Sequence, residues 1–176
     1  MAALIEQKLP LAGDLEQAFL AHHARVLKAA YRITGSMADA EDVAQTVFLR
    51  YASAASGQQI QNAESYFYRA AINAALDLLR RRRHENLVAI DEAHSVQSSA
   101  PRPDGPERQM RDWMRQALAN LSPKAAEMLV LRYIEGFDLG EVARALSTSR
   151  AVVAVTLHRT RARLRSEYQA HLRGTK

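Results

Sequence analysis

The chain of 176 residues contains no cysteine. Disulfide frameworks, thiolate metal sites and cysteine nucleophiles are therefore excluded. Long apolar runs are absent too, since no window approaches the ~20 apolar residues of a membrane-spanning helix. The first ten residues include Glu6 and Lys8, so we expect no signal peptide. These absences favour a soluble, cytoplasmic protein without membrane insertion.

Strand signals are equally scarce. No segment alternates β-branched and aromatic residues with polar ones, as a half-buried strand does. Ala, Leu, Arg, Glu and Gln dominate instead, and all of them favour helices. The sequence therefore predicts an all-α fold, with a length that permits one ordinary domain or two small ones.

Catalytic patterns are missing as well. The sequence shows no Ser/His/Asp set, Gly-rich phosphate loop or acidic metal cluster. His22 and His23 are adjacent, so they point to different sides of a helix and cannot chelate a metal as an i, i+4 pair could. We expect no enzyme, no cofactor and no metal.

The charge is unevenly distributed around a net value of +5. Residues 69–84 carry a local charge of +4 and residues 141–173 one of +5, whereas residues 85–108 between them sum to −3. Basic blocks of this kind favour an anionic partner such as nucleic acid.

Proline and serine mark the clearest break in the chain. Three prolines lie between residues 101 and 106, and proline cannot continue a helix. We expect an N-terminal tail at 1–13, a helical domain at 14–84, an extended acidic linker at 85–107 and a second helical domain at 108–176.

The first domain is expected to hold about four helices. One covers residues 14–34, and the next follows Ser36, which forms a capping box with Asp39. That helix ends near Ala52, and a long helix begins near Glu64 and ends in an arginine run.

The second domain contains the pattern of a helix-turn-helix. Asp138 and Glu141 predict a capping box for a short helix, and Ser149 can cap the last helix, which runs to about His171. Ser122 and Pro123 predict the start of an earlier helix in the same domain.

The helix-turn-helix has an apolar side and a basic side. The short helix is expected to pack through Val142, Ala143 and Leu146 against Val152, Val153, Val155 and Leu157. The exposed side then carries Arg150, Thr156, Arg159, Arg161 and Arg163. Such a helix can lie in a major groove with arginines on phosphates, although two bundled helices with a solvated arginine face fit the same pattern.

Two further groups of residues lie in the first domain. Tyr66, Phe67 and Tyr68 precede Asn73 and the arginine run at 80–83, which suits stacking on single-stranded bases or, alternatively, core packing. Acids near the start of the second helix either bind a partner or simply favour a helix N-terminus.

Three motifs in order resemble the extracytoplasmic-function (group IV) sigma factors of the sigma-70 family. Residues 38–50 (ADAEDVAQTVFLR) resemble the family's region 2.2, and residues 66–83 (YFYRAAINAALDLLRRRR) resemble regions 2.3 and 2.4. Residues 121–136, 141–143 and 157–164 resemble region 4. The resemblance implies two helical domains, a four-helix region 2 and a helix-turn-helix region 4, joined by an extended linker.

The resemblance also implies partners and roles. An alternative sigma factor binds core RNA polymerase, recognises the −10 and −35 elements of promoter DNA and promotes melting; an anti-sigma factor is a further expected partner. The polymerase-binding residues would be Asp39, Glu41, Asp42, Gln45 and Phe48. The −10 residues would be Tyr66, Tyr68, Asn73, Arg80 and Arg81. The −35 residues would be Ser149, Arg150, Ala151, Thr156, Arg159 and Arg161. The loop at 57–64 would help hold a flipped base, and the acidic linker would thread the RNA channel.

The recognition helix departs from the family pattern. The family usually has a Gly-Thr-Val-Lys-Ser-Arg-like run where residues 151–156 read AVVAVT, so Ala154 and Thr156 replace a lysine and an arginine. Thr46 likewise stands where an acid is usual. Two alternatives remain: a sigma-like decoy that binds polymerase or an anti-sigma factor without initiating, and a stand-alone helix-turn-helix repressor. The apolar substitutes either read thymine methyl groups or pack on another protein.

Overall fold

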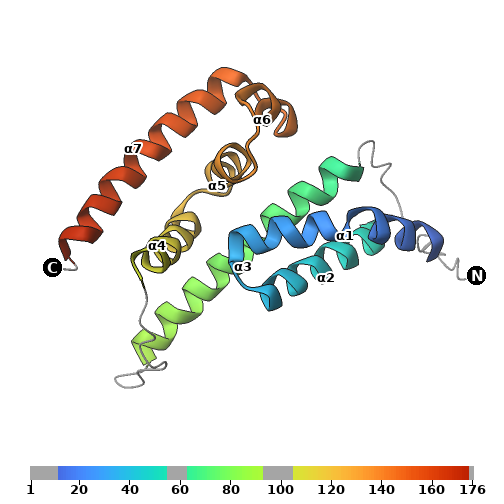
Figure 1. Cartoon of the computed structure of the whole chain (residues 1–176), viewed down its shortest axis with the longest axis horizontal. Helices are drawn as coiled ribbons and strands as arrows, with labels where there is room; N and C mark the ends of the chain where they lie inside the picture. Colours follow the sequence, from blue (N-terminus) through green and yellow to red (C-terminus); the bar gives the residue numbers. More distant parts are fainter. Residues whose placement is uncertain (1–11, 55–62, 93–104, 175–176) are drawn as a thin grey trace, which may run out of the picture. The chain divides into compact units, whose positions relative to one another are not determined.

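Helices make up nearly all of the computed structural model, which describes residues 12–54, 63–92 and 105–174 (Figure 1). The described residues contain no strand, so the predicted all-α fold is confirmed. The chain divides into two compact units, Met1–Ala75 and Leu76–Lys176. The expected path of the linker through residues 93–104 and the base-binding role of the loop at 57–62 lie outside the described residues.

The first unit is built on a helical hairpin. Helix α1 (Ala12–Thr34) packs along α2 (Met37–Ala54), and α3 (Ala63–Glu92) follows. The hairpin turns at Gly35, whose φ of 70° suits a residue without a Cβ, and the Gly35 N–H donates to the Tyr31 carbonyl. Ser36 caps α2 as predicted, because its Oγ accepts from the Asp39 N–H at 3.4 Å.

The described part of residues 12–92 holds three helices, and residues 55–62 between α2 and α3 lie outside it. The length of α3 corrects one expectation. This helix continues to Glu92, so the first eight residues of the expected extended linker are helical. The sequence explains this extension, because the first proline after the arginine run is Pro101 and nothing before it forbids a helix.

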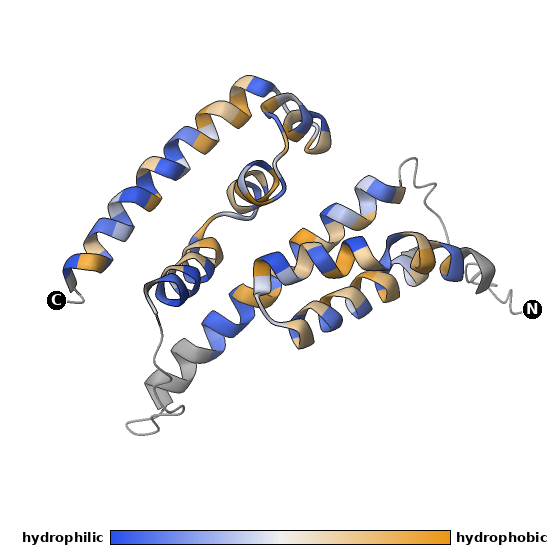
Figure 2. Ribbon diagram, in the orientation of Figure 1, coloured by the Kyte–Doolittle hydropathy of each residue, from blue (hydrophilic) through white to orange (hydrophobic). Residues whose placement is uncertain are grey.

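The second unit is a group of helices around an apolar centre. Besides the part of α3 from Leu76 on, it comprises α4 (Pro106–Asn120), α5 (Pro123–Leu129), the π-helical turn η1 (Val130–Ile134), α6 (Leu139–Ala145) and α7 (Arg150–Gly174). The fully buried side chains include Leu118, Met128, Leu131, Val142 and Val153. Figure 2 shows the apolar residues of each helix interleaved with polar ones, as expected for helices with one buried face.

Local capping signals position the helix-turn-helix. Asp138 accepts from the Glu141 N–H at 2.8 Å, and the Glu141 side chain accepts from the Asp138 N–H at 2.7 Å, which confirms the predicted capping box. Ser149 caps α7 as predicted by accepting from the Val152 N–H at 3.2 Å. Pro123 begins α5 as predicted, but Ser122 makes no side-chain hydrogen bond at that cap.

One expectation for the apolar side of the helix-turn-helix is wrong. Val153 and Leu157 are buried, but Val152 and Val155 are 45% and 50% exposed. The helical period gives the reason, since residues 153, 157, 160 and 164 follow one face of α7 whereas residues 152 and 155 fall outside it.

The capping box makes the stability of the second unit sensitive to acid. The hydrogen bond from the Glu141 N–H is the main reason why the pKa of Asp138 lies below its usual value of 3.8. A lowered pKa means that the folded state favours the carboxylate, so its contribution is complete above about pH 3.8 and is lost as the pH falls through the lower folded value.

We expect Asp138→Ala to lower the urea midpoint at neutral pH and to differ less from the wild type as the pH falls below 3.8. Asp138→Asn is the control, because asparagine caps a helix but does not titrate. Urea unfolding at a series of pH values checks this. A difference between the alanine variant and the wild type that does not change with pH would contradict the assignment.

Candidate functional site

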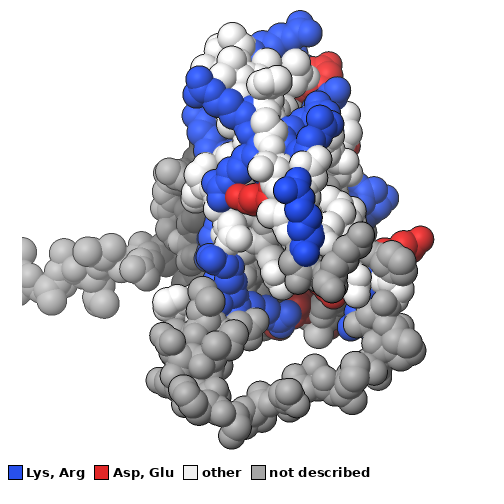
Figure 3. All heavy atoms as spheres, turned by 90° about the vertical axis from the view of Figure 1, so that its left-hand side faces the viewer, with Lys and Arg blue, Asp and Glu red and all other residues white. Residues whose placement is uncertain are grey.

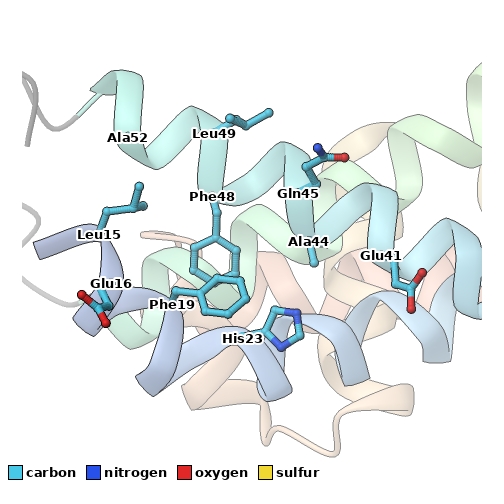
Figure 4. Close-up of a pocket in the computed structure, with 10 residues that line it drawn as sticks. All are labelled: Leu15, Glu16, Phe19, His23, Glu41, Ala44, Gln45, Phe48, Leu49 and Ala52. Carbon is cyan, nitrogen blue, oxygen red and sulfur yellow. The ribbon is translucent and has the colours of Figure 1, made fainter. Parts of the chain in front are cut away.

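An apolar groove lies between α1 and α2. It has a volume of about 500 Å³. Figure 4 shows Phe48 reaching from α2 toward Phe19 of α1, with His23 beside them. Phe19 and Leu49 both line the groove and are 43% and 63% exposed, so apolar side chains face solvent together at this place.

Three of the five polymerase-binding residues expected from the sequence, Glu41, Gln45 and Phe48, line this groove. Glu41 and Gln45 are exposed and line the groove, and Asp42 is exposed on the same helix. Phe48 also lines the groove but is only 7% exposed, so it belongs to the groove floor. Asp39 is 3% exposed in the first turn of α2, so its side chain lies away from this surface.

The aromatic residues expected at the −10 surface separate onto two faces of α3. Phe67 and Tyr68 are buried, and the Arg25 guanidinium lies over the Tyr68 ring at 5.7 Å from its centroid. Tyr66 is half-buried, and its ring contacts Phe67 edge-on with 5.5 Å between the centroids. The alternative of core packing therefore describes Tyr68, while Tyr66 remains partly accessible.

A polar stripe runs along α3 opposite its buried face. Tyr66, Arg69, Asn73, Asp77 and Arg80 recur at spacings of three and four residues, which places them on one side of the helix. The described part of the chain leaves each of them at least partly exposed. The stripe thus collects three of the five residues expected at the −10 element, and Arg81 is exposed beside it.

The stripe ends in a concentration of positive charge. Arg80 donates to Asp77 at 2.8 Å, an i, i+3 pair within the helix. Arg81, Arg82 and Arg83 are exposed immediately after it. Four consecutive arginines at one point of a helix create a local attraction for phosphate that one aspartate does not cancel.

The residues expected at the −35 element lie at the exposed N-terminal part of α7 and beyond it. Ser149, Arg150, Ala151 and Arg159 are exposed, whereas Thr156 is partly covered. The Arg161 guanidinium lies 5.7 Å from the centroid of the Tyr133 ring, so one arginine is held against η1. Figure 3 shows the face on the left-hand side of Figure 1, where α7 is drawn. Many Lys and Arg and few Asp and Glu are visible on this face.

The turn before α7 is tightly defined. Ser147 has a φ of 48°, and the Thr148 N–H donates to the Ala143 carbonyl at 2.9 Å. Val142, Ala143 and Leu146 are buried on one side of the turn, as are Val153 and Leu157 on the other. These contacts fix the direction in which α7 leaves the turn.

Sequence reasoning missed two features of these surfaces. It did not identify Phe19 and Leu49 as exposed parts of a groove, because apolar residues at helical spacing usually indicate core. It also missed the exposure of Val152 and Val155, which a helical projection of α7 would have revealed. Within the described residues, no helix is both long enough and apolar enough to cross a membrane.

Comparison with known proteins identifies both halves of the chain. Residues 18–85 match the Sigma-70 region 2 family and residues 111–164 match the Sigma-70, region 4 family. The chain is 32% identical over 147 residues to an RNA polymerase sigma-E factor of Streptomyces coelicolor, covering 82% of this chain and 80% of that protein.

Other relatives agree with this match. The chain is 30% identical over 153 residues to the ECF RNA polymerase sigma factor SigE of Mycolicibacterium smegmatis, which covers 85% of this chain but only 60% of that longer relative. Its fold resembles that of the sigma factor RpoE of Bartonella quintana, solved in complex with the anti-sigma factor NepR. The TM-score is 0.51 at 21% identity, over 90% of this chain and 98% of that one. The chain belongs to the extracytoplasmic-function sigma factors of the sigma-70 family.

Proposed function

We propose that the chain is an active alternative sigma factor that divides its work among three surfaces. The groove between α1 and α2 binds core RNA polymerase, the polar stripe of α3 engages the −10 element, and the N-terminal part of α7 reads the −35 element. Membership of the sigma family supports the overall function. The division among three surfaces is supported by their composition, because the groove is apolar with an acid at its edge, whereas α3 and α7 carry exposed arginines.

The groove has the composition of a protein-binding surface. Apolar side chains that stay exposed together lose contact with water only when a partner covers them, which favours association. Exposed Glu41 and Gln45 line the groove, and Asp42 is exposed next to Glu41 on the same helix, so the two acids can set the orientation of the partner through charge. Since a polar rim around an apolar centre is typical of protein interfaces, we assign the groove to the polymerase rather than to DNA.

The stripe on α3 suits DNA that is being melted. Tyr66 offers a ring face for stacking, Asn73 offers an amide for base edges, and the adjacent arginines attract phosphate. Stacking and polar contacts of this kind stabilise unpaired bases that a closed duplex does not present. The chain carries out no bond chemistry of its own in this mechanism.

An anti-sigma factor fits the same picture. An exposed apolar groove needs cover when no polymerase is bound, and a regulator that occupies it would prevent initiation by competition. The Bartonella quintana sigma factor was solved in complex with the anti-sigma factor NepR. We therefore propose an anti-sigma partner for the resting protein in the cytoplasm.

The decoy hypothesis makes a different use of the same surfaces. It is favoured by the replacement of the usual lysine and arginine by Ala154 and Thr156, both of which are partly covered on α7. A decoy would bind polymerase through the groove and leave promoters silent, so polymerase binding alone does not separate the two hypotheses.

Charge reversal at Glu41 and Asp42 tests the polymerase surface. We expect the double variant E41K/D42K to bind core polymerase at least about tenfold more weakly, because two favourable charges become repulsive. The control is Glu167→Lys, which reverses an acid near the C-terminal end of α7. Binding of labelled full-length chain to core polymerase measures the effect. Equal affinity of the double variant and the wild type would rule out this surface.

Tyr66 tests the −10 surface. Tyr66→Ala should reduce open-complex formation, because it removes the stacking of one base, which contributes about 1–3 kcal/mol to binding. Tyr66→Phe should keep both the ring and the activity. Tyr31→Ala removes an exposed tyrosine from α1 and is the matched control. Permanganate reactivity of melted thymines measures the open complex, and thermal unfolding checks the fold. The assignment is wrong if the alanine variant melts promoter DNA as well as the wild type does.

A further inference from the structure

The N-terminal part of α7 exposes an apolar patch inside a basic surface. We define this valine patch as Ala151, Val152 and Val155, which are all exposed and lie three and four residues apart on one side of the helix. The two valines are 45% and 50% exposed, even though Val153 between them is completely buried. About half of each valine therefore faces solvent, outside the buried face of the helix-turn-helix.

Arginines lie next to the patch along the helix. Arg150 precedes it, and Arg159 follows Val155 by one turn, with both side chains exposed. A positive border of this kind complements a phosphate backbone and opposes the approach of a basic partner. Charge complementarity thus selects DNA as the occupant, with arginines on the phosphates and the valine patch directed at the floor of the groove.

The major groove offers one kind of apolar group to such a patch. The C5 methyl of thymine projects there, and the other groups on the base edges are hydrogen-bond donors and acceptors. A helix-turn-helix places the N-terminal residues of its second helix against base edges, and Val152 and Val155 occupy that part of α7. Short branched side chains allow the helix to come close enough to touch these methyl groups.

We propose that Val152 and Val155 give this sigma factor its specificity by contacting thymine methyl groups in the −35 element. The inference rests on the proposed function, since it needs α7 to enter the major groove. It gives a positive role to residues that replace the usual polar pattern. Base choice then depends on methyl contacts, while arginines supply affinity that is independent of sequence.

Removal of single methyl groups from DNA tests the proposal directly. In the first step, core polymerase carrying the full chain selects promoter fragments from a pool randomised across the −35 region. In the second step, each thymine enriched in that region is replaced by deoxyuridine, which lacks only the C5 methyl group. We expect binding to weaken roughly fourfold for each contacted methyl, the effect of exposing about one buried CH₂ group. The V152S/V155S double variant should bind thymine and deoxyuridine templates equally.

Leu172→Ser is the matched control, because Leu172 is also 50% exposed but lies at the other end of α7. This variant should keep the preference of the wild type for thymine. Selection of promoters without enriched thymines, or equal binding of thymine and deoxyuridine templates by the wild type, would overturn the methyl contacts while leaving the sigma function intact. Failure to select any promoter would overturn both. A serine variant that keeps the preference would exclude the valines as its source.

Discussion

Contacts among aromatic rings hold the three helices of the first unit together. Phe67 of α3 lies 5.0 Å from Phe48 of α2 between ring centroids and 4.8 Å from His22 of α1, so one ring joins all three helices. Tyr51 contacts the same ring at 4.8 Å. Aromatic rings at these distances stabilise the fold both by burying apolar surface and by the favourable geometry of the ring–ring contacts. Because Phe67 faces inward, the opposite side of α3 faces outward, and that side carries the polar stripe.

The same cluster gives the groove its floor. Phe48 contacts Phe67 on one side and Phe19 on the other, with 5.0 Å between the ring centroids in each case. Phe19 is left 43% exposed at the edge of this cluster. The apolar core of the unit thus extends to the surface at one place, next to Glu41 and Gln45. A partner that covers the groove continues a packing arrangement that already exists.

Signals that act within a few residues could be predicted from the sequence. The capping box at Asp138 and Glu141 and the cap at Ser149 depend on side chains that bond to backbone groups three residues away, so local spacing suffices. The burial of Tyr68 depends on which face of α3 meets a neighbour, and the sequence alone does not choose among the three adjacent aromatic residues 66–68. The exposure of Val155 follows from the helical period of α7, which the apolar spacing alone did not reveal without a projection of the helix. The π-helical turn at 130–134 has no comparable local signal.

Run-off transcription from a promoter library, with core RNA polymerase alone and with this chain added, tests the central claim most directly. An active sigma factor yields specific transcripts that require the chain, with start sites preceded by common −10 and −35 elements. Polymerase that binds the chain and still produces no specific transcript from any template would contradict the account, and the decoy hypothesis would then explain the protein.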